Sequence, residues 1–116
     1  MRLIDFLKKH DEEGKEKHVP GITAVECSSC GELTVTVQMG KDVMHPSTPE
    51  HSIRFINLFG KTLEGQTVLI ANFNLEGQNS MPRVKISVKR KTYSELLAVA
   101  FCNLHGMWEN SLEIKL

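Results

Sequence analysis

The sequence lacks an excess of charge of either sign and lacks long apolar runs. Its 14 basic and 14 acidic side chains cancel, so nothing indicates nucleic acid or an anionic membrane surface as a partner. Apolar stretches such as LLAVAF at 96–101 are far too short to span a bilayer. The first 18 residues have neither the apolar stretch nor the small-residue cleavage site of a secretory signal. We therefore expect a cytoplasmic protein that does not bind membranes or nucleic acid.

Cysteine is also scarce. Three cysteines in 116 residues are an odd number, and in a reducing compartment cysteines more often serve as metal ligands, redox groups or buried apolar residues than as structural cross-links. With 41% apolar and 24% charged residues, the composition is that of an ordinary globular protein. The length suits one domain with a real core, and we expect residues 1–116 to form that single domain.

Short runs with strand-like patterns dominate the chain. The segments 32–39 (ELTVTVQM) and 83–90 (RVKISVKR) alternate apolar and polar residues, which predicts strands with one solvated face. Five further runs are rich in β-branched or apolar residues and are separated by Gly, Asn, Pro and Ser: 22–27, 52–59, 67–75, 95–102 and 111–116.

Helical spacing occurs only near the start. Leu3, Ile4 and Leu7 within 2–10 suit a short amphipathic helix, and the charged segment 11–17 is typical of a loop. The predicted fold is therefore all-β: an immunoglobulin-like, seven-stranded antiparallel β-sandwich with a short N-terminal helix.

The histidines cluster outside the strands. His45 and His51 lie in VMHPSTPEH, where Pro46 and Pro49 exclude a central strand. Thr48 suits the N-cap of a helical turn, with proline at the first helical position. We expect a stiff loop that opens into a helical turn and holds two imidazoles facing one point.

The thiol of Cys102 precedes His105 by three residues at the end of the most apolar strand. Two ligands at this spacing on a tight turn can bind one ion. Taken singly, His18 and His10 suit solvated surface positions, and Cys102 suits a core thiol. A sandwich that brings strand ends together makes a shared metal site from His18, His45, His51, Cys102 and His105 the stronger interpretation.

Three segments carry a resemblance to a known family: GKEKHVPGI at 14–22, GKDVMHPSTPEHSI at 40–53 and FCNLHGMWEN at 101–110. In this order they resemble the metal-site segments of superoxide reductases, the neelaredoxin and desulfoferrodoxin family. The resemblance implies one non-haem iron per chain with one axial thiolate ligand, Cys102, and four equatorial imidazole ligands: His18, His45, His51 and His105. The N-terminal four-cysteine domain of two-iron members has no counterpart here.

The same resemblance implies the reaction and its partners. Superoxide would be reduced by one electron to hydrogen peroxide at an open sixth position, with electrons from a rubredoxin-like protein. Lys17 would steer the anion, and Glu16 would occupy the sixth position in the ferric resting state and leave it on reduction. Homodimers or homotetramers are expected, and Trp108 is expected to pack beside the site.

Two other functions fit parts of the pattern. A copper electron-transfer protein would use Cys102, His105 and Met107 on a β-sandwich, but it has no use for the other histidines. A non-catalytic binding module would hold no transition metal.

The motif CSSC at 27–30 stands apart from all these segments. It supplies only two of the four ligands that a structural zinc ion needs. Its two cysteines are either turn residues without a function or a redox-active pair that relays electrons or responds to peroxide.

Overall fold

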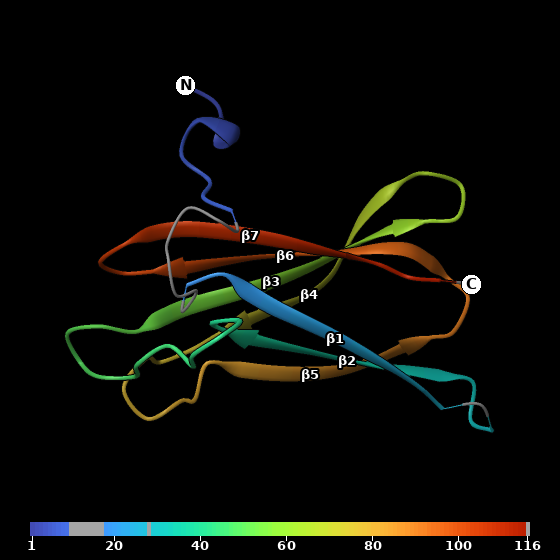
Figure 1. Ribbon diagram of the computed structural model, residues 1–116, viewed down its shortest axis with the longest axis horizontal. Helices are drawn as coiled ribbons and strands as arrows, with labels where there is room; N and C mark the ends of the chain where they lie inside the picture. Colours follow the sequence, from blue (N-terminus) through green and yellow to red (C-terminus); the bar gives the residue numbers. More distant parts are fainter. Residues whose placement is uncertain (10–17, 28, 116) are drawn as a thin grey trace.

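The seven predicted strands form two packed antiparallel sheets (Figure 1). The computed structural model describes residues 1–9, 18–27 and 29–115. One sheet has the strand order β1-β2-β5 and the other β4-β3-β6-β7. The strands are β1 (Pro20–Cys27), β2 (Glu32–Met39), β3 (Ile53–Thr62), β4 (Thr67–Asn74), β5 (Arg83–Lys89), β6 (Tyr93–Cys102) and β7 (Gly106–Glu113).

Most strand boundaries agree with the pattern in the sequence, and the last strand differs. β7 begins at Gly106, directly after His105, rather than at residue 111. Glycine at position 106 has a φ of 86°, a conformation that side chains other than glycine rarely adopt. Because the chain reverses there at once, Cys102 pairs with Gly106 across a tight turn. The metal-ligand candidates Cys102 and His105 therefore lie on a β-hairpin.

The predicted N-terminal helix is much shorter than expected. Among residues 2–9, which the structure describes, Leu3–Asp5 alone form a helical turn, of the 3-10 type, and none of its residues is buried. The following residues extend along β7: Lys8 donates its backbone N–H to the Met107 carbonyl, and its own carbonyl accepts from Glu109. Pairing with a strand edge thus outweighs the weak helical propensity of nine residues.

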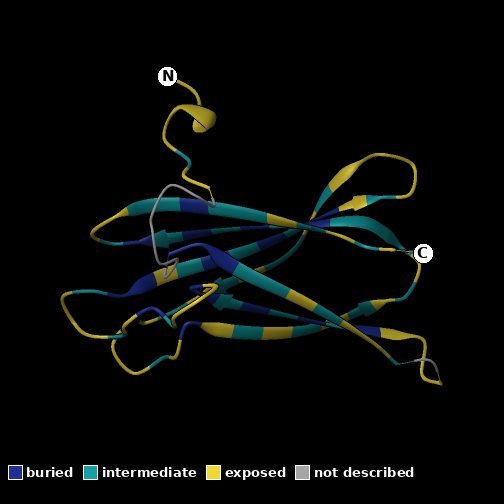
Figure 2. Ribbon diagram, in the orientation of Figure 1, coloured by how far each residue is buried: buried dark blue, intermediate teal, exposed yellow. Residues whose placement is uncertain are grey.

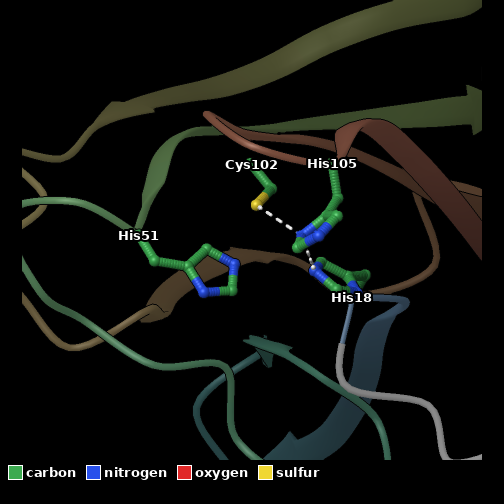
Figure 3. Close-up of side chains that lie close together, drawn as sticks. All are labelled: His18, His51, Cys102 and His105. Carbon is green, nitrogen blue, oxygen red and sulfur yellow. Dashed lines mark hydrogen bonds between the residues drawn. The ribbon is translucent and has the colours of Figure 1, made fainter.

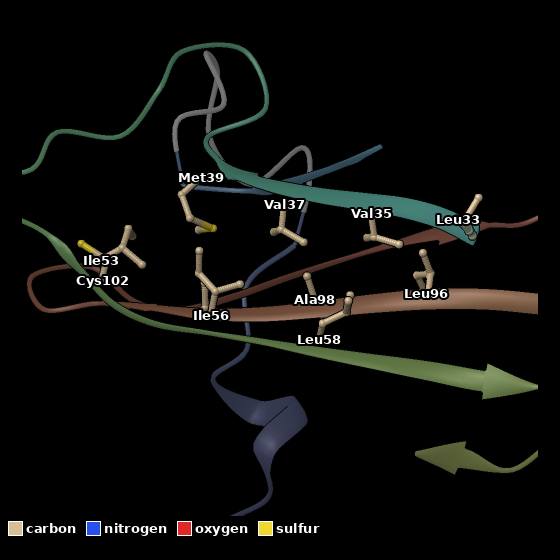
Figure 4. Close-up of a cluster of buried hydrophobic side chains, with 11 residues drawn as sticks. Leu33, Val35, Val37, Met39, Ile53, Ile56, Leu58, Leu96, Ala98 and Cys102 are labelled. Carbon is tan, nitrogen blue, oxygen red and sulfur yellow. The ribbon is translucent and has the colours of Figure 1, made fainter. Parts of the chain in front are cut away.

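The core lies between the two sheets and extends to the thiol of Cys102. Alternate residues of β2, Leu33, Val35, Val37 and Met39, face the core. On the other sheet the core residues are Ile53, Ile56, Leu58, Leu96, Ala98, Ala100 and Cys102 (Figure 4). The burial pattern of Figure 2 follows this alternation, with buried positions between half-buried ones along β2.

An irregularity at the start of β3 matters for the site. Ile53 pairs with Cys102 and Phe55 pairs with Phe101, so Arg54 is an extra residue between two pairs. Such a bulge shifts which side chains face inward, and it lets both Ile53 and Ile56 enter the core. The pairing also fixes the segment that precedes Ile53 beside the end of β6.

No helix among the described residues is long and apolar enough to cross a membrane.

Candidate metal centre

Antiparallel pairing brings the three segments that carry the ligand candidates to one end of the sandwich. β1, β3 and β7 begin at this end, while β2 and β6 end there. Residue 18 precedes β1, residues 45 and 51 lie in the connection from β2 to β3, and residues 102 and 105 lie at the turn from β6 to β7. Both sheets therefore contribute side chains to the same place.

Four side chains converge closely enough to hold one ion. The ligand atoms of His18, His51, Cys102 and His105 all lie within 4.8 Å of one another (Figure 3). His18 Nε2 lies 3.0 Å from His105 Nδ1, and Cys102 Sγ lies 3.7 Å from the same nitrogen. Two metal–nitrogen bonds of about 2.1 Å at a right angle would separate their nitrogens by about 3.0 Å. The separation between His18 and His105 fits ligands of a shared ion.

The fourth histidine completes a ring of imidazoles. The centroids of neighbouring rings are 4.8 Å apart for His18 and His45, 4.5 Å for His45 and His51, 5.0 Å for His51 and His105, and 4.6 Å for His105 and His18. The diagonal from His18 to His51 is longer, at 6.0 Å. The four rings therefore stand at the corners of a rough square. His45 is outside the tight group of ligand atoms, although its ring occupies one corner.

Hydrogen bonds of His45 orient its ring. Its Nδ1 lies 2.8 Å from the Pro46 carbonyl oxygen, and its backbone N–H donates to Met39 at the end of β2. A proton donated from Nδ1 to a carbonyl leaves Nε2 with a lone pair, the form that binds a metal. The Nε2 atoms of His45 and His51 are both buried. Buried nitrogen atoms of this kind suit metal binding better than hydrogen bonding to water.

The predicted helical turn after Thr48 is wrong, although the capping interaction exists. Residues 49–51 form a bend rather than a helix. The backbone N–H of His51 donates to Thr48 Oγ1 over 3.0 Å, and Thr48 and His51 also exchange backbone hydrogen bonds. One closed turn is enough to fix His51, because the chain must then enter β3 at Ile53.

Asn103 joins the two loops that carry ligand candidates, and the sequence patterns did not reveal it. Its Oδ1 accepts from the Ser52 backbone N–H and its Nδ2 donates to the Glu50 carbonyl, both over 2.9 Å. Its own N–H donates to the Ser52 carbonyl. The Cys102 turn is thereby tied to the segment around His51. The sequence feature that could have indicated this role was an amide side chain directly after Cys102.

Trp108 packs beside the site, as predicted. Its ring stacks on His18 with centroids 5.1 Å apart and an interplanar angle of 16°, and its Nε1 donates to the His105 carbonyl. Lys8 donates from Nζ to the same carbonyl over 3.2 Å. The helix predicted for the N-terminus gave no indication of this contact. Trp108 and Lys8 together hold the turn that carries His105.

The metal-ligand candidates differ in how far they are buried. Cys102 is fully buried, His45 is 2% and His18 3% exposed, His51 is half-buried and His105 is exposed. A bound ion would therefore be sheltered on the core side and reachable from the His105 side. Glu16, Lys17 and His10 lie outside the described residues.

Three imidazoles and a thiolate, with a fourth imidazole adjacent, suit a first-row transition metal such as iron. Imidazole nitrogens are donors of borderline softness and the thiolate is a soft donor, a combination that suits such a metal. A closed structural zinc site would need only four ligands. A copper centre using Met107 fits less well. Met107 pairs with Phe101 in the register of β6 and β7, and the two line a groove outside the core together with Leu104.

Comparisons with known proteins agree with this site. The desulfoferrodoxin family model matches residues 10–111. The chain belongs to the desulfoferrodoxin family. A superoxide reductase from Pyrococcus abyssi is 36% identical over 97% of this chain and 99% of its own length. Neelaredoxin from Megalodesulfovibrio gigas is 34% identical over 100% of this chain and 99% of its own length.

A solved structure extends the likeness to the fold. The superoxide reductase (neelaredoxin) from Ignicoccus hospitalis superposes with a TM-score of 0.80 at 30% identity, covering 99% of this chain and 98% of that one. The predicted immunoglobulin-like sandwich and the family assignment are both confirmed.

The link between the two ligand loops leads to a prediction. Replacing Asn103 by alanine removes two side-chain hydrogen bonds, so we expect the affinity for Fe²⁺ to fall by roughly 10- to 100-fold while the fold is retained. Competition with a chelator measures the affinity, and circular dichroism checks the fold. Asn72→Ala, on the exposed side of β4, is the matched control and should bind as the unaltered chain does. An Asn103→Ala variant with unchanged affinity would contradict the role of this link.

Proposed function

We propose that this chain is a superoxide reductase, an oxidoreductase that converts superoxide to hydrogen peroxide at one non-haem iron. The observation that carries the proposal is the convergence of His18, His51, Cys102 and His105 at one end of the sandwich, in a chain of the desulfoferrodoxin family. Several relatives that match nearly the whole chain are superoxide reductases.

The proposed ligand set has five members. His18, His45, His51 and His105 would form the plane, which their square of rings supports. Cys102 would supply the axial thiolate from the core. When bound, iron would supply the one-electron redox chemistry, with an external donor as the source of the electron. These five residues would hold the ion and would leave it accessible to a small substrate.

The protein controls charge at the site through Cys102. Its thiolate is the only anionic member of the ligand set, so a divalent ion held there keeps a net positive charge that attracts a small anion. Its complete burial excludes water from the sulfur and strengthens its electrostatic effect. The surrounding imidazoles are held by Trp108, Asn103 and the Pro46 carbonyl, which limits reorganisation during electron transfer.

Glu16 and Lys17 are proposed to act from the segment before His18. Lys17 would attract superoxide and favour protonation of the developing peroxide. Glu16 would occupy the open position in the oxidised protein and withdraw on reduction. Their place in the sequence supports both roles, since they directly precede a proposed ligand.

The electron donor is proposed to be a rubredoxin-like protein in the cytoplasm. Each superoxide needs one external electron, and His105 is the exposed edge of the site. A groove of about 600 Å³ adjoins His105 and has mainly apolar walls, including Phe6, Phe101 and Leu104. Such a surface suits contact with a small redox protein. Stopped-flow oxidation of reduced rubredoxin by the ferric protein tests this partner, and an absence of electron transfer would exclude it.

A test of the axial ligand follows from the geometry. Cys102→Ser should abolish the thiolate-to-iron absorption of the oxidised protein and reduce superoxide reduction to background, because an alcohol is a weaker and neutral ligand. The matched control is the double change Cys27→Ser with Cys30→Ser, which leaves the site untouched and should change neither. Absorption and activity both surviving in Cys102→Ser would rule out the axial assignment.

Electrostatic steering by Lys17 gives a second test. Lys17→Ala should slow the bimolecular reaction with superoxide by about tenfold at low salt and flatten its dependence on ionic strength. Lys61→Ala, which alters an exposed lysine towards the end of β3 away from the site, should leave the rate nearly unchanged. Pulse radiolysis at several salt concentrations measures both. An unaltered rate with an unaltered salt slope would refute the steering role.

A homo-oligomer is also proposed, through the outer face of the four-stranded sheet. Leu97 and Val99 alternate with the core residues of β6 and so lie on this face, outside the groove that adjoins His105. An apolar sheet face of this kind suits burial against a second copy. Sedimentation velocity should show a dimer or tetramer that Val99→Glu dissociates. A monomer at all concentrations would contradict the proposal.

A further inference from the structure

The pair Cys27 and Cys30 lies at the end of the molecule opposite the metal centre. Cys27 ends β1, Cys30 lies in the following turn, and the two form a disulfide. Figure 1 shows this β1–β2 turn far from the end where β1 begins. An eight-residue strand spans roughly 25 Å, so the pair is too distant to exchange electrons with the metal centre of the same chain directly. The disulfide needs an explanation of its own.

Stabilisation of the fold explains the disulfide poorly. The β1–β2 ladder already continues to the pair Cys27 and Glu32. The turn itself uses Gly31 at a φ of 73°, whose carbonyl accepts from the Arg90 backbone N–H. The stabilisation that a disulfide gains from chain entropy grows with the length of the loop it closes, and this loop contains only two intervening residues. The bond adds little to a hairpin that hydrogen bonds already close.

Reagents can reach the sulfur atoms from solvent. Cys30 is exposed and Cys27 is half-buried, and the neighbouring Ser29, Gly31 and Glu32 are all exposed. Labile and catalytic disulfides have this accessibility, whereas inert structural cysteines are buried. Cys102, the remaining cysteine, is buried and is the proposed thiolate ligand of the metal centre.

The two sulfur atoms have different surroundings. Cys27 Sγ lies 3.7 Å from Ser29 Oγ, a hydroxyl that can donate a hydrogen bond to a thiolate. Cys30 Sγ lies 3.8 Å from the Glu32 carboxylate, which repels a thiolate. Negative charge is therefore better accommodated on Cys27. The more exposed Cys30 is the sulfur that an incoming thiol reaches.

We propose that Cys27 and Cys30 form a reversible redox site that hydrogen peroxide oxidises and an external protein dithiol reduces. In reduction, a thiolate of that dithiol attacks Cys30, the bond between the two cysteines breaks, and Cys27 leaves as a thiolate. The second thiol of the reductant then attacks the mixed disulfide and releases Cys30, so the reductant ends as a disulfide.

In oxidation, the Cys27 thiolate attacks one oxygen of peroxide, the O–O bond breaks, and hydroxide leaves and is protonated to water. Cys27 is then a sulfenic acid. The Cys30 thiol attacks its sulfur, the disulfide forms, and a second water leaves. In sum, two thiols and one hydrogen peroxide give one disulfide and two waters.

This site adds an activity to the proposed superoxide reduction and rests on it only for the source of peroxide. The peroxide released at one end of the sandwich can diffuse to the hairpin turn at the other end. The chain would thus consume part of the peroxide that it produces, or respond to that peroxide through the oxidation state of Cys27 and Cys30.

The experiment uses the full-length, iron-loaded protein and added hydrogen peroxide, so it does not depend on superoxide chemistry. The protein is reduced with roughly tenfold excess dithiothreitol, freed of reductant, exposed to peroxide, alkylated and mapped by mass spectrometry. We expect alkylation of both Cys27 and Cys30 after reduction, and loss of both adducts after peroxide. The double change Cys27→Ser with Cys30→Ser should retain superoxide reduction, which separates this test from that of the metal centre.

Single variants test the assigned roles. Cys30→Ser should accumulate a sulfenic acid on Cys27 that dimedone traps, because no resolving thiol remains. Cys27→Ser should react with peroxide at least about tenfold more slowly. A disulfide that dithiothreitol leaves intact would overturn the proposal, as would a reduced pair that keeps both thiols in peroxide. Equal peroxide reactivity of the two single variants would overturn the assignment of Cys27 as nucleophile.

Discussion

The pairing of the start of β3 with the end of β6 is the interaction on which the candidate site depends. Ile53 pairs with Cys102, and from this pair the chain leads to His51 in one direction and His105 in the other. Asn103 adds three hydrogen bonds between the same two segments. A slip of one residue in this register would turn Cys102 away from the core. The register therefore decides whether the thiol and the imidazoles can share an ion.

The second sheet completes the arrangement through the position of β1. Asn110 on β7 donates from Nδ2 to the Pro20 carbonyl over 2.9 Å, which fixes the start of β1 against the edge of the other sheet. His18 is then stacked on Trp108 and within hydrogen-bonding distance of His105. Cys102 belongs at once to the hydrophobic core and to the donor set. Core packing and metal binding thus constrain each other at this residue.

Much of this architecture could be predicted from the sequence, because its signals are local. Alternation in 32–39 gives β2 with the same boundaries in the structure, and the proline-containing loop and the C-x-x-H spacing indicated ligands. Contacts between segments that lie far apart in the sequence could not be predicted from local patterns. The helical spacing of 2–10 did not reveal that Lys8 pairs with β7, nor did the isolated Asn103 reveal its partners. The start of β7 was missed because Gly106, which begins the strand, is also a turn residue.

The proposed enzyme uses electrons from a donor to convert superoxide to hydrogen peroxide and returns no oxygen. Measuring peroxide formed and oxygen evolved per superoxide consumed, with the iron-loaded chain and an excess of reduced rubredoxin, tests it most directly. One-electron reduction predicts about one hydrogen peroxide per superoxide and no oxygen, since every electron comes from the donor. About half a peroxide per superoxide, with an equal amount of oxygen, would indicate dismutation and contradict the proposed reduction.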